Sequence, residues 1–288
     1  MLHLVINQTA GSGFAKKVGE KVIQWLTEEG RPHSVSYTEG PGHAEELAKS
    51  AVTKGAETVI AVGGDGTVCE TARGLLGTKT ALGVVPAGTG NDFAKALGMP
   101  KKPREALSFI FDHPARPVDA GRVNDLAFFN VCGTGFDVCV LDYTLAAKKY
   151  VRGMLPYLWG VIRTIFTFQS VNATVQLDGG EKEQHSVLIL SVANGPCFGG
   201  GIKIAPEAKP NDGFFEFITI DHMPRWRIAF QLPRLVSGKV DRIPGFSQRR
   251  CKSVLIEAEN MRINLDGEII PVKEAAFEML EGALMAHY

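Results

Sequence analysis

The sequence predicts an α/β domain followed by a second, mainly β domain. Short apolar runs rich in β-branched residues alternate with helix-like stretches over the first hundred residues. Three glycine-rich segments lie in this part of the chain, each shortly after an apolar run. Past about Arg116 the pattern changes to strand-like runs separated by turn-prone pairs. The length of 288 residues fits two domains of roughly 100–200 residues each, or one large domain.

The α/β domain is predicted to span residues 1–116. Its strand-like runs are Leu2–Ile6, Ser34–Thr38, Thr58–Val62 and Ala81–Val85, and its helix-like stretches are Ala15–Glu28, Ala44–Thr53 and Val68–Leu76. Alternation of this kind is typical of a parallel sheet covered by helices on both faces. Ligands of such sheets bind beyond the carboxyl ends of the strands, which is where the glycine-rich segments fall.

The second domain is predicted to span residues 117–274. Its later strand-like runs are Asn172–Leu177, Ser186–Ala193, Phe214–Ile220, Ser253–Glu257 and Arg262–Leu265. Asp-Gly pairs at 178–179 and 266–267 suit tight turns between antiparallel strands. A helical insert is expected over residues 138–168, and a last strand near residues 275–288 is expected to return to the first domain.

Composition narrows the function classes. Lys plus Arg and Asp plus Glu both number 31, which excludes a nucleic-acid binder that depends on overall positive charge. The five cysteines are odd in number and show no CxxC spacing, so a cytoplasmic location is expected rather than a disulfide framework. Arg152, Pro156 and Arg163 interrupt the most apolar stretch, residues 151–168, which disfavours a spanning helix and leaves contact with a membrane surface open.

The segment Gly63-Gly-Asp-Gly-Thr67 carries the strongest local signal. Its glycines leave backbone N–H groups free to face anionic oxygens, and the helix that follows adds positive potential. Asp65 suits Mg²⁺, and Thr67 suits either a helix cap or a phosphate oxygen. A plain capped turn is the alternative, but an acid within a glycine-rich loop at a strand end favours phosphate handling.

Two further glycine-rich loops follow other strands. Gly88-Thr-Gly-Asn-Asp92 places a second acid at the same predicted sheet edge, although Asn91 or Asp92 could also cap the next helix. Ala10–Gly13 contains only GxG, and Lys16 stands where the third glycine of a dinucleotide fingerprint belongs. A standard nicotinamide dinucleotide site is therefore not expected.

Together these motifs resemble the bacterial diacylglycerol-kinase-like lipid kinases, which share a catalytic domain with sphingosine and ceramide kinases. The matching segments are Asn7 with Ala10–Gly13, Thr38, Gly63–Thr67, Pro86–Lys95, Val118–Gly121, Gly133–Asp137, Gly199–Phe215 and Leu265–Glu268. They come in the family's order and cover nearly the whole chain. The resemblance implies a nucleotide-binding domain like that of NAD kinase and phosphofructokinase, a β-sandwich, and ATP in the cleft between them. One departure is Asn7-Gln8, where the family usually has Asn-Pro.

The resemblance also implies which residues bind ATP and Mg²⁺. The expected nucleotide-binding residues are Asn7, Thr38, Gly63, Gly64, Asp65, Gly66, Thr67, Glu70, Gly88, Thr89 and Asn91. An acidic network near the magnesium-bound phosphates is expected from Asp65, Asp92 and Asp119. A structural magnesium site is expected from the Asp212 carboxylate and the backbone carbonyls of Lys209 and Phe214, for which a plain Asn-Asp-Gly turn is the alternative.

Phosphoryl transfer also needs a group that takes the acceptor's proton. The resemblance assigns this role to Glu268, with Asp266 as its supporting neighbour, whereas the tetrapeptide alone would suggest a solvated turn. Phe198–Gly201 is expected to line the acceptor cleft or to form a bulged turn. The leading function is transfer of the γ-phosphoryl group of ATP to diacylglycerol. Phosphatidylglycerol, a sphingoid base or a soluble polyol remain alternative acceptors, and an NAD kinase or a non-catalytic regulator is less favoured.

The helical insert points to a lipid substrate at a membrane surface. It interleaves apolar and basic residues, which suits an acyl chain beside anionic lipid as well as an ordinary core helix pair with solvated lysines. A peripheral membrane association is expected on the first interpretation. No nucleic-acid partner is expected. Because kinases of this kind are often dimers, a homodimer is an open expectation.

Overall fold

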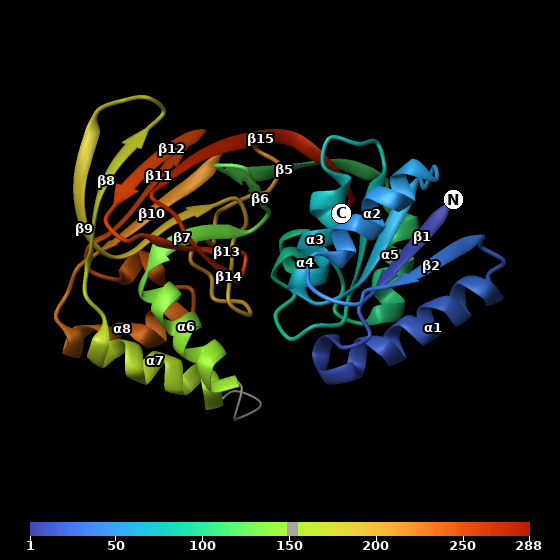
Figure 1. The fold of residues 1–288 in the computed structure, drawn as a ribbon, viewed down its shortest axis with the longest axis horizontal. Helices are drawn as coiled ribbons and strands as arrows, with labels where there is room; N and C mark the ends of the chain where they lie inside the picture. The colour runs from blue at the N-terminus through green and yellow to red at the C-terminus, as the bar shows by residue number, and fades with distance from the viewer. Residues whose placement is uncertain (149–154) are drawn as a thin grey trace.

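The computed structural model describes residues 1–148 and 155–288, which form two lobes (Figure 1). One lobe holds the N-terminal strands and their covering helices, and the other is built mostly of antiparallel strands. Two long strands, β5 (Ala115–Val123) and β15 (Glu274–His287), run along the top of Figure 1 between the lobes. The predicted architecture, an α/β domain followed by a mainly β domain, is confirmed.

The first lobe is organised around a parallel sheet. Its strands are β1 (Leu2–Ile6), β2 (His33–Tyr37), β3 (Thr58–Gly63) and β4 (Ala81–Pro86), in the order β2-β1-β3-β4. Every residue of β3 and β4 is buried, which suits their unbroken runs of Val, Ile, Leu and Ala between two helix layers. Because the strands are parallel, the loops that follow β1, β3 and β4 emerge at one edge of the sheet.

Helices cover both faces of this sheet. They are the short 3-10 helix η1 (Ala10–Gly13), α1 (Phe14–Glu28), α2 (His43–Thr53), α3 (Asp65–Leu75), α4 (Asp92–Ala96) and α5 (Pro103–Asp112). Helices α1 and α5 pack together, and α2 packs on α3. Helix α5 was not predicted. It starts at Pro103, a favoured first helical position, and buries Ala106, Leu107 and Ile110.

The second lobe is a folded antiparallel sheet. Its remaining strands are β6 (Leu126–Phe128), β7 (Val131–Gly135), β8 (Val171–Leu177), β9 (Lys182–Ala193), β10 (Phe215–Asp221), β11 (Phe246–Cys251), β12 (Ser253–Ala258), β13 (Arg262–Leu265) and β14 (Glu268–Pro271). The main path runs β14-β13-β7-β9-β8-β12-β15, with β10 pairing β9 and β11. One apolar core lies within the sheet, around Phe128, Phe215 and Phe277, and a second lies between the sheet and helices.

Three helices cover the lower side of this lobe in Figure 1: α6 (Phe136–Lys148), α7 (Leu155–Thr167) and α8 (Arg225–Val236), with η2 (Val240–Arg242) after them. The insert predicted over residues 138–168 is thus described as two helices, and its residues 149–154 lie outside the described residues. Helix α8 and strand β11 were not predicted. Within residues 1–148 and 155–288, no helix is both long and apolar enough to cross a bilayer.

Strand β15 connects the two sheets. Its first part pairs with β12 and β5, and its last part pairs in parallel with β4 at Met285 and Ala286. The register with β5 shifts between Leu280 and Leu284, where Gly282 has a φ of 58°. The chain therefore turns from one sheet to the other within a single strand, at a bulge. The domain boundaries proposed from the sequence remain predictions.

Candidate active site

Backbone meets backbone where the glycine-rich loops converge. A Cβ atom on Gly88 would lie 2.3 Å from the Cα of Gly64, so the loops after β3 and β4 touch without room for a side chain. A Cβ on Gly11 would lie 2.5 Å from the carbonyl oxygen of Ala87, which brings the loop after β1 to the same place. The three loops therefore form one continuous backbone surface at the carboxyl edge of the sheet.

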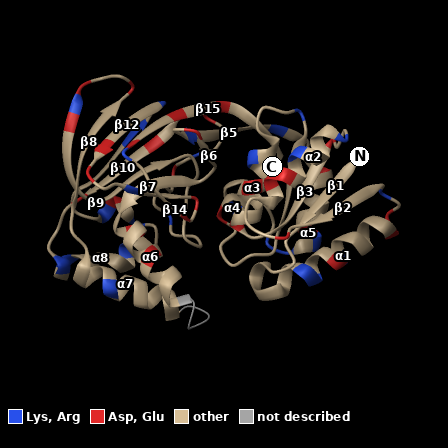
Figure 2. Ribbon diagram, viewed as in Figure 1, with Lys and Arg blue, Asp and Glu red and all other residues tan. Residues whose placement is uncertain are grey.

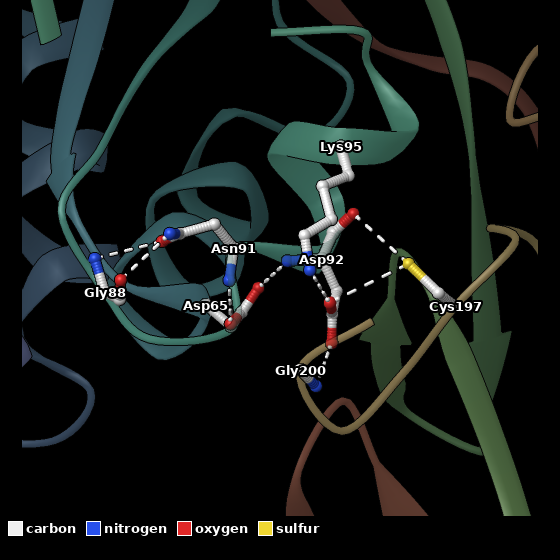
Figure 3. Close-up of polar contacts among 7 residues, drawn as sticks. All are labelled: Asp65, Gly88, Asn91, Asp92, Lys95, Cys197 and Gly200. Carbon is white, nitrogen blue, oxygen red and sulfur yellow. Dashed lines mark hydrogen bonds and ion pairs between the residues drawn. The ribbon is translucent and has the colours of Figure 1, made fainter. Parts of the chain in front are cut away.

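Asp65 binds the two loops to each other (Figure 3). Its Oδ2 accepts a hydrogen bond from the backbone N–H of Asn91 at 2.7 Å, and its Oδ1 accepts one from the N–H of Asp92. Burial, followed by the nearby Asp92 carboxylate, raises the pKa of Asp65, while the backbone hydrogen bonds oppose that shift. Each carboxylate oxygen has a second lone pair, so Asp65 keeps acceptor capacity beyond these two hydrogen bonds.

Asp92 extends the same network to the second lobe. The residue is 4% exposed. Its carboxylate accepts hydrogen bonds from Lys95 Nζ at 3.0 Å and from the backbone N–H of Gly200 at 2.7 Å (Figure 3). The Cys197 thiol lies 3.7 Å from Oδ1, and burial together with Asp92 raises the pKa of Cys197 to about 12, so the thiol stays neutral. Asp92 thus attaches the Phe198–Gly201 segment to the α/β lobe.

Asn7 and Thr67 form a second polar contact beneath the loops. Asn7 Nδ2 donates to Thr67 Oγ1 at 3.0 Å, and Asn7 Oδ1 accepts from the N–H and hydroxyl of Thr9. Helix α3 begins at Asp65, and its N-cap residue Gly64 makes no side-chain cap. Of the two roles considered for Thr67, the helix cap is therefore wrong, because Thr67 lies inside the first turn of α3, and the contact with a phosphate oxygen stays a prediction.

Asn91 stabilises the second loop from within. It lies at the N-cap position of α4 in a left-handed conformation, with a φ of 54°, which asparagine tolerates better than most residues. Its side chain accepts from the Gly88 N–H at 3.0 Å and donates to the Gly88 carbonyl at 2.9 Å. The side chain therefore does not cap the helix, and the carboxylate that receives the first N–H groups of α4 is that of Asp65.

The other predicted nucleotide contacts differ in position. Thr89 is exposed and lines a pocket of about 260 Å³ together with Asn91 and Lys95. Thr38 is half-buried at the end of β2, where its N–H donates to Ile6. Glu70 accepts a hydrogen bond from the N–H of Ala44, at the start of α2. Its carboxylate therefore supports a neighbouring helix, a role that the sequence did not reveal.

The turn between β13 and β14 carries two acids with opposite environments. Asp266 accepts hydrogen bonds from the N–H groups of Phe129, Asn130 and Val131 at 2.7, 3.0 and 3.2 Å. Burial raises the pKa of Asp266, and these three hydrogen bonds oppose the shift. Glu268 has a side chain that is 56% exposed and lies 3.6 Å from the Arg73 guanidinium of α3. The turn thus presents Glu268 toward the α/β lobe.

Asp119 lies outside the Asp65–Asp92 network. Its carboxylate accepts from the N–H groups of Gly213 at 2.8 Å and Gly282 at 2.7 Å, and among the described residues no hydrogen bond joins it to Asp65 or Asp92. Asp119 therefore holds the turn before β10 against the bulge of β15. Its place in the expected acidic network near the magnesium-bound phosphates stays a prediction.

The second metal position predicted from the sequence has a mixed charge environment. One oxygen of Asp212 accepts from the Phe214 N–H at 3.2 Å, and the other pairs with Arg250. Arg250 and Lys252 also lie over the Phe214 ring. Among the residues that the structure describes, no group of three or more His, Cys, Asp or Glu could hold a metal. A cation bound by Lys209, Asp212 and Phe214 remains a prediction without support from this geometry.

Several residues at the site escaped prediction. Lys95 lay within the Pro86–Lys95 motif, and its position three residues after Asp92 was the signal that it pairs with that acid. Arg73 reaches Glu268, and Cys197 reaches Asp92, through tertiary contacts, the second across 105 residues of chain. No local sequence pattern predicts contacts between residues so far apart in the chain.

Comparison with solved structures first identifies the class of fold. An NAD kinase from Archaeoglobus fulgidus, solved in complex with ATP, superposes with a TM-score of 0.59 at 14% identity, covering 100% of this chain and 94% of that one. A diacylglycerol kinase from Bacillus anthracis superposes more closely, with a TM-score of 0.75 at 23% identity, covering 100% and 96%. These likenesses establish the fold, an α/β domain with a β-sandwich of the NAD kinase type.

Sequence comparison then identifies the family. The diacylglycerol kinase catalytic domain matches residues 1–123, and the YegS C-terminal NAD kinase beta sandwich-like domain matches residues 130–286. A diacylglycerol kinase from Bacillus subtilis is 30% identical over 92% of this chain and 89% of its own length. A probable lipid kinase, YegS-like, from Chromohalobacter salexigens is 33% identical over 90% and 85%. The chain belongs to the diacylglycerol kinase and YegS-like family of lipid kinases, and it is a phosphotransferase with an alcohol acceptor.

Proposed function

We propose that this enzyme transfers the γ-phosphoryl group of Mg·ATP to the hydroxyl of diacylglycerol. The observation that supports this most is the meeting of both lobes at one edge of the parallel sheet. Loops after three strands touch there, Asp92 binds the Gly200 N–H of the other lobe, and Glu268 faces α3. A nucleotide at this edge would lie beside an acceptor presented by the second lobe.

The loops supply donors for the phosphate chain. Helix α3 starts at Asp65 without a side-chain cap, so its first N–H groups remain available to an anion. A Cβ atom on Gly66 would meet nothing within 4 Å, so the space above this turn is open. Thr89 and Lys95 add a hydroxyl and an ammonium group at the adjacent pocket. These groups suit phosphates better than a neutral ligand.

Asp65 and Asp92 fit a magnesium ion that travels with ATP. Both are carboxylates at the phosphate-facing edge, and their mutual repulsion contributes to the raised pKa of Asp65. A bound divalent cation offsets that repulsion and neutralises charge on the phosphates. The chain's own contribution is the fixed placement of the two acids, which hydrogen bonds from Asn91, Lys95 and Gly200 provide.

We assign the role of general base to Glu268. Phosphoryl transfer requires that the acceptor's proton leave, and an exposed carboxylate on the second lobe can accept it. Asp266 holds the turn in place by accepting hydrogen bonds from three backbone N–H groups. The backbone that carries Glu268 is therefore fixed. Arg73 contacts Glu268 from the first lobe and helps to orient it.

The test is a phosphorylation assay with a panel of acceptors in mixed micelles, with and without Mg²⁺. We expect radiolabelled phosphate from ATP to appear in phosphatidic acid when diacylglycerol is present, and little transfer without Mg²⁺. Stronger transfer to phosphatidylglycerol, a sphingoid base or NAD would overturn the proposed acceptor while leaving the reaction class intact. ATP turnover with no phosphorylated product from any acceptor would count against the proposed function as a whole.

A further inference from the structure

Helices α7 and α8 present their large apolar side chains outward. Thirteen large apolar side chains are exposed among the described residues, and eight of them lie on these two helices. They are Leu155, Leu158, Trp159, Ile162 and Phe166 on α7, and Trp226, Phe230 and Val236 on α8. Phe166 is 68% exposed and Phe230 is 73% exposed. Concentration on two neighbouring helices marks a surface with a binding role rather than scattered exposure.

Helix α7 reverses the usual arrangement of a surface helix. Its buried positions are small or constrained, namely Pro156, Gly160 and Thr164. A Cβ atom on Gly160 would lie 2.5 Å from Thr144 Oγ1, so α7 packs closely on α6 through this small face. A helix that contacts only water on its other side normally carries polar residues there. The outer face of α7 therefore fits an apolar environment.

The charges on this surface all have one sign. Helix α7 carries Arg163 and helix α8 carries Arg225, Arg227 and Arg234, and neither helix contains an acid. Figure 2 shows only Lys and Arg colouring on these two helices. Arg163 lies 5.9 Å from the centre of the Trp159 ring, and Arg227 lies 5.1 Å from that of Trp226. Aromatic rings beside arginines suit the boundary between lipid tails and phosphate headgroups.

The two helices form one face of the molecule. They contact each other, and their inner residues share the apolar core beneath the sheet, including Ile228 and Ile165. Figure 1 shows them along the lower edge of the β lobe. Helix α6, on which α7 packs, contacts β14, the strand that begins with Glu268. The outward face is thus connected through one helix to the acceptor side of the cleft.

We propose that the α7–α8 face docks on an anionic lipid bilayer. The apolar side chains enter the boundary of the acyl region, and the arginines bind lipid phosphates. Charge favours this occupant over a second copy of the chain, because a twofold contact would set arginines against arginines with no acid on either helix to pair with them. The purpose of docking, delivery of a lipid acceptor, rests on the proposed function, but the docking itself does not require catalysis.

Vesicle sedimentation tests the proposal. The wild-type chain is expected to bind phosphatidylcholine vesicles that contain about 30% phosphatidylglycerol, to bind pure phosphatidylcholine more weakly, and to lose affinity as salt rises. The double variant Trp159→Ala, Phe230→Ala should bind at least ~10-fold more weakly, because two exposed apolar groups are removed from the lipid contact. Leu126→Ala removes an apolar side chain that is 39% exposed on β6, and should bind like the wild type.

Tryptophan fluorescence identifies the face that docks. Two of the three tryptophans, Trp159 and Trp226, lie on it, whereas Trp25 packs near Arg104 in the other lobe. Brominated lipids should quench single-tryptophan variants that retain Trp159 or Trp226 and leave the variant with Trp25 alone unquenched. Quenching of Trp25 instead, or equal binding by the double variant and the wild type, would overturn the proposal.

Two further outcomes distinguish membrane docking from self-association and from catalysis. If the wild type sediments as a dimer in vesicle-free buffer and the double variant as a monomer, the face joins copies of the chain and the proposal is wrong. Binding to vesicles without phosphorylation of any lipid supports docking and counts against the proposed function. Phosphorylation of micellar diacylglycerol without vesicle binding has the opposite meaning.

Discussion

The loop cluster of the α/β lobe and the β13–β14 turn of the second lobe use acidic residues differently. In the loop cluster both acids, Asp65 and Asp92, accept hydrogen bonds from backbone N–H groups; Asp92 is buried and Asp65 is half-buried. In the turn, Asp266 is enclosed in the same way while Glu268 is exposed. An enclosed acid holds loops in position, and an exposed acid on a fixed turn is free to take a proton. Family motifs alone do not separate these two roles.

Glu268→Gln gives the largest expected effect. It removes the proton acceptor while keeping the side chain's shape, so we expect kcat to fall by about 10²–10⁴-fold. Because Glu268 is exposed, the free energy of unfolding and the affinity for ATP should stay near wild type. Steady-state kinetics and ATP titration measure both. Wild-type turnover would remove Glu268 from the proposed mechanism.

Asp266→Asn tests how much the other acid of the β13–β14 turn contributes to stability. Asparagine tolerates the positive φ of 47° but replaces one of the two acceptor oxygens with an NH2 group, which cannot accept a hydrogen bond, so at least one of the N–H groups of Phe129, Asn130 and Val131 loses its partner. We expect the free energy of unfolding to fall by about 2 kcal/mol, since a buried donor loses its partner. Urea denaturation measures the change. An unchanged midpoint would mean that the three hydrogen bonds contribute little to holding the turn.

Gly88→Ala should disturb the loop cluster more than Gly66→Ala. The first substitution places Cβ 2.3 Å from the Gly64 backbone, whereas the second meets nothing within 4 Å. We expect Gly88→Ala to raise the KM for ATP by roughly ten-fold as the loops separate. Gly66→Ala is the matched control for the free energy of unfolding, which should fall for Gly88→Ala and stay near wild type for Gly66→Ala. Equal losses of stability in the two variants would show that contact between the loops does not hold them in place.

The smallest expected effect concerns pH. Burial raises the pKa of Asp137, whose carboxylate accepts from Asn264 and whose Oδ1 has no hydrogen-bond partner among residues 1–148 and 155–288. Below the ordinary pKa of 3.8 the group is neutral in both states and does not disfavour folding; as pH rises from there through the raised pKa, ionisation favours the unfolded chain and stability falls. Asp137→Asn should therefore remove this fall from the acidic part of the stability profile. Thermal unfolding across that range, compared with the wild type, measures it.

The local pattern of apolar residues predicted the strands and helices of the first lobe more completely than those of the second. The apolar runs that became β1, β3 and β4 are buried on both faces, so their identity is visible over a few residues. Helix α8 contains Pro233 and points Trp226 and Phe230 outward, which conceals the pattern of a helix packed on a core. The sequence therefore indicates an element best when its apolar side faces the interior.

The site residues also differ in how far local sequence predicts their contacts. The meeting of Asp65 with the Asn91–Asp92 segment was predictable because parallel strands end at one edge. The partners of Asp119 were not predictable, because its carboxylate accepts from Gly213 and Gly282, which lie 94 and 163 residues further along the chain. The enclosed and exposed states of Asp266 and Glu268 likewise depend on segments remote in sequence.

The passage of β15 from one sheet to the other has a consequence for dissecting the enzyme. Residues Met285 and Ala286 pair with one edge of β4, so a fragment ending at residue 116 would leave the backbone N–H and C=O groups of that edge unpaired. Unpaired edge strands promote strand pairing between molecules and hence aggregation. The N-terminal half is thus expected to precipitate when produced alone and to become soluble again when the C-terminal segment is supplied in trans.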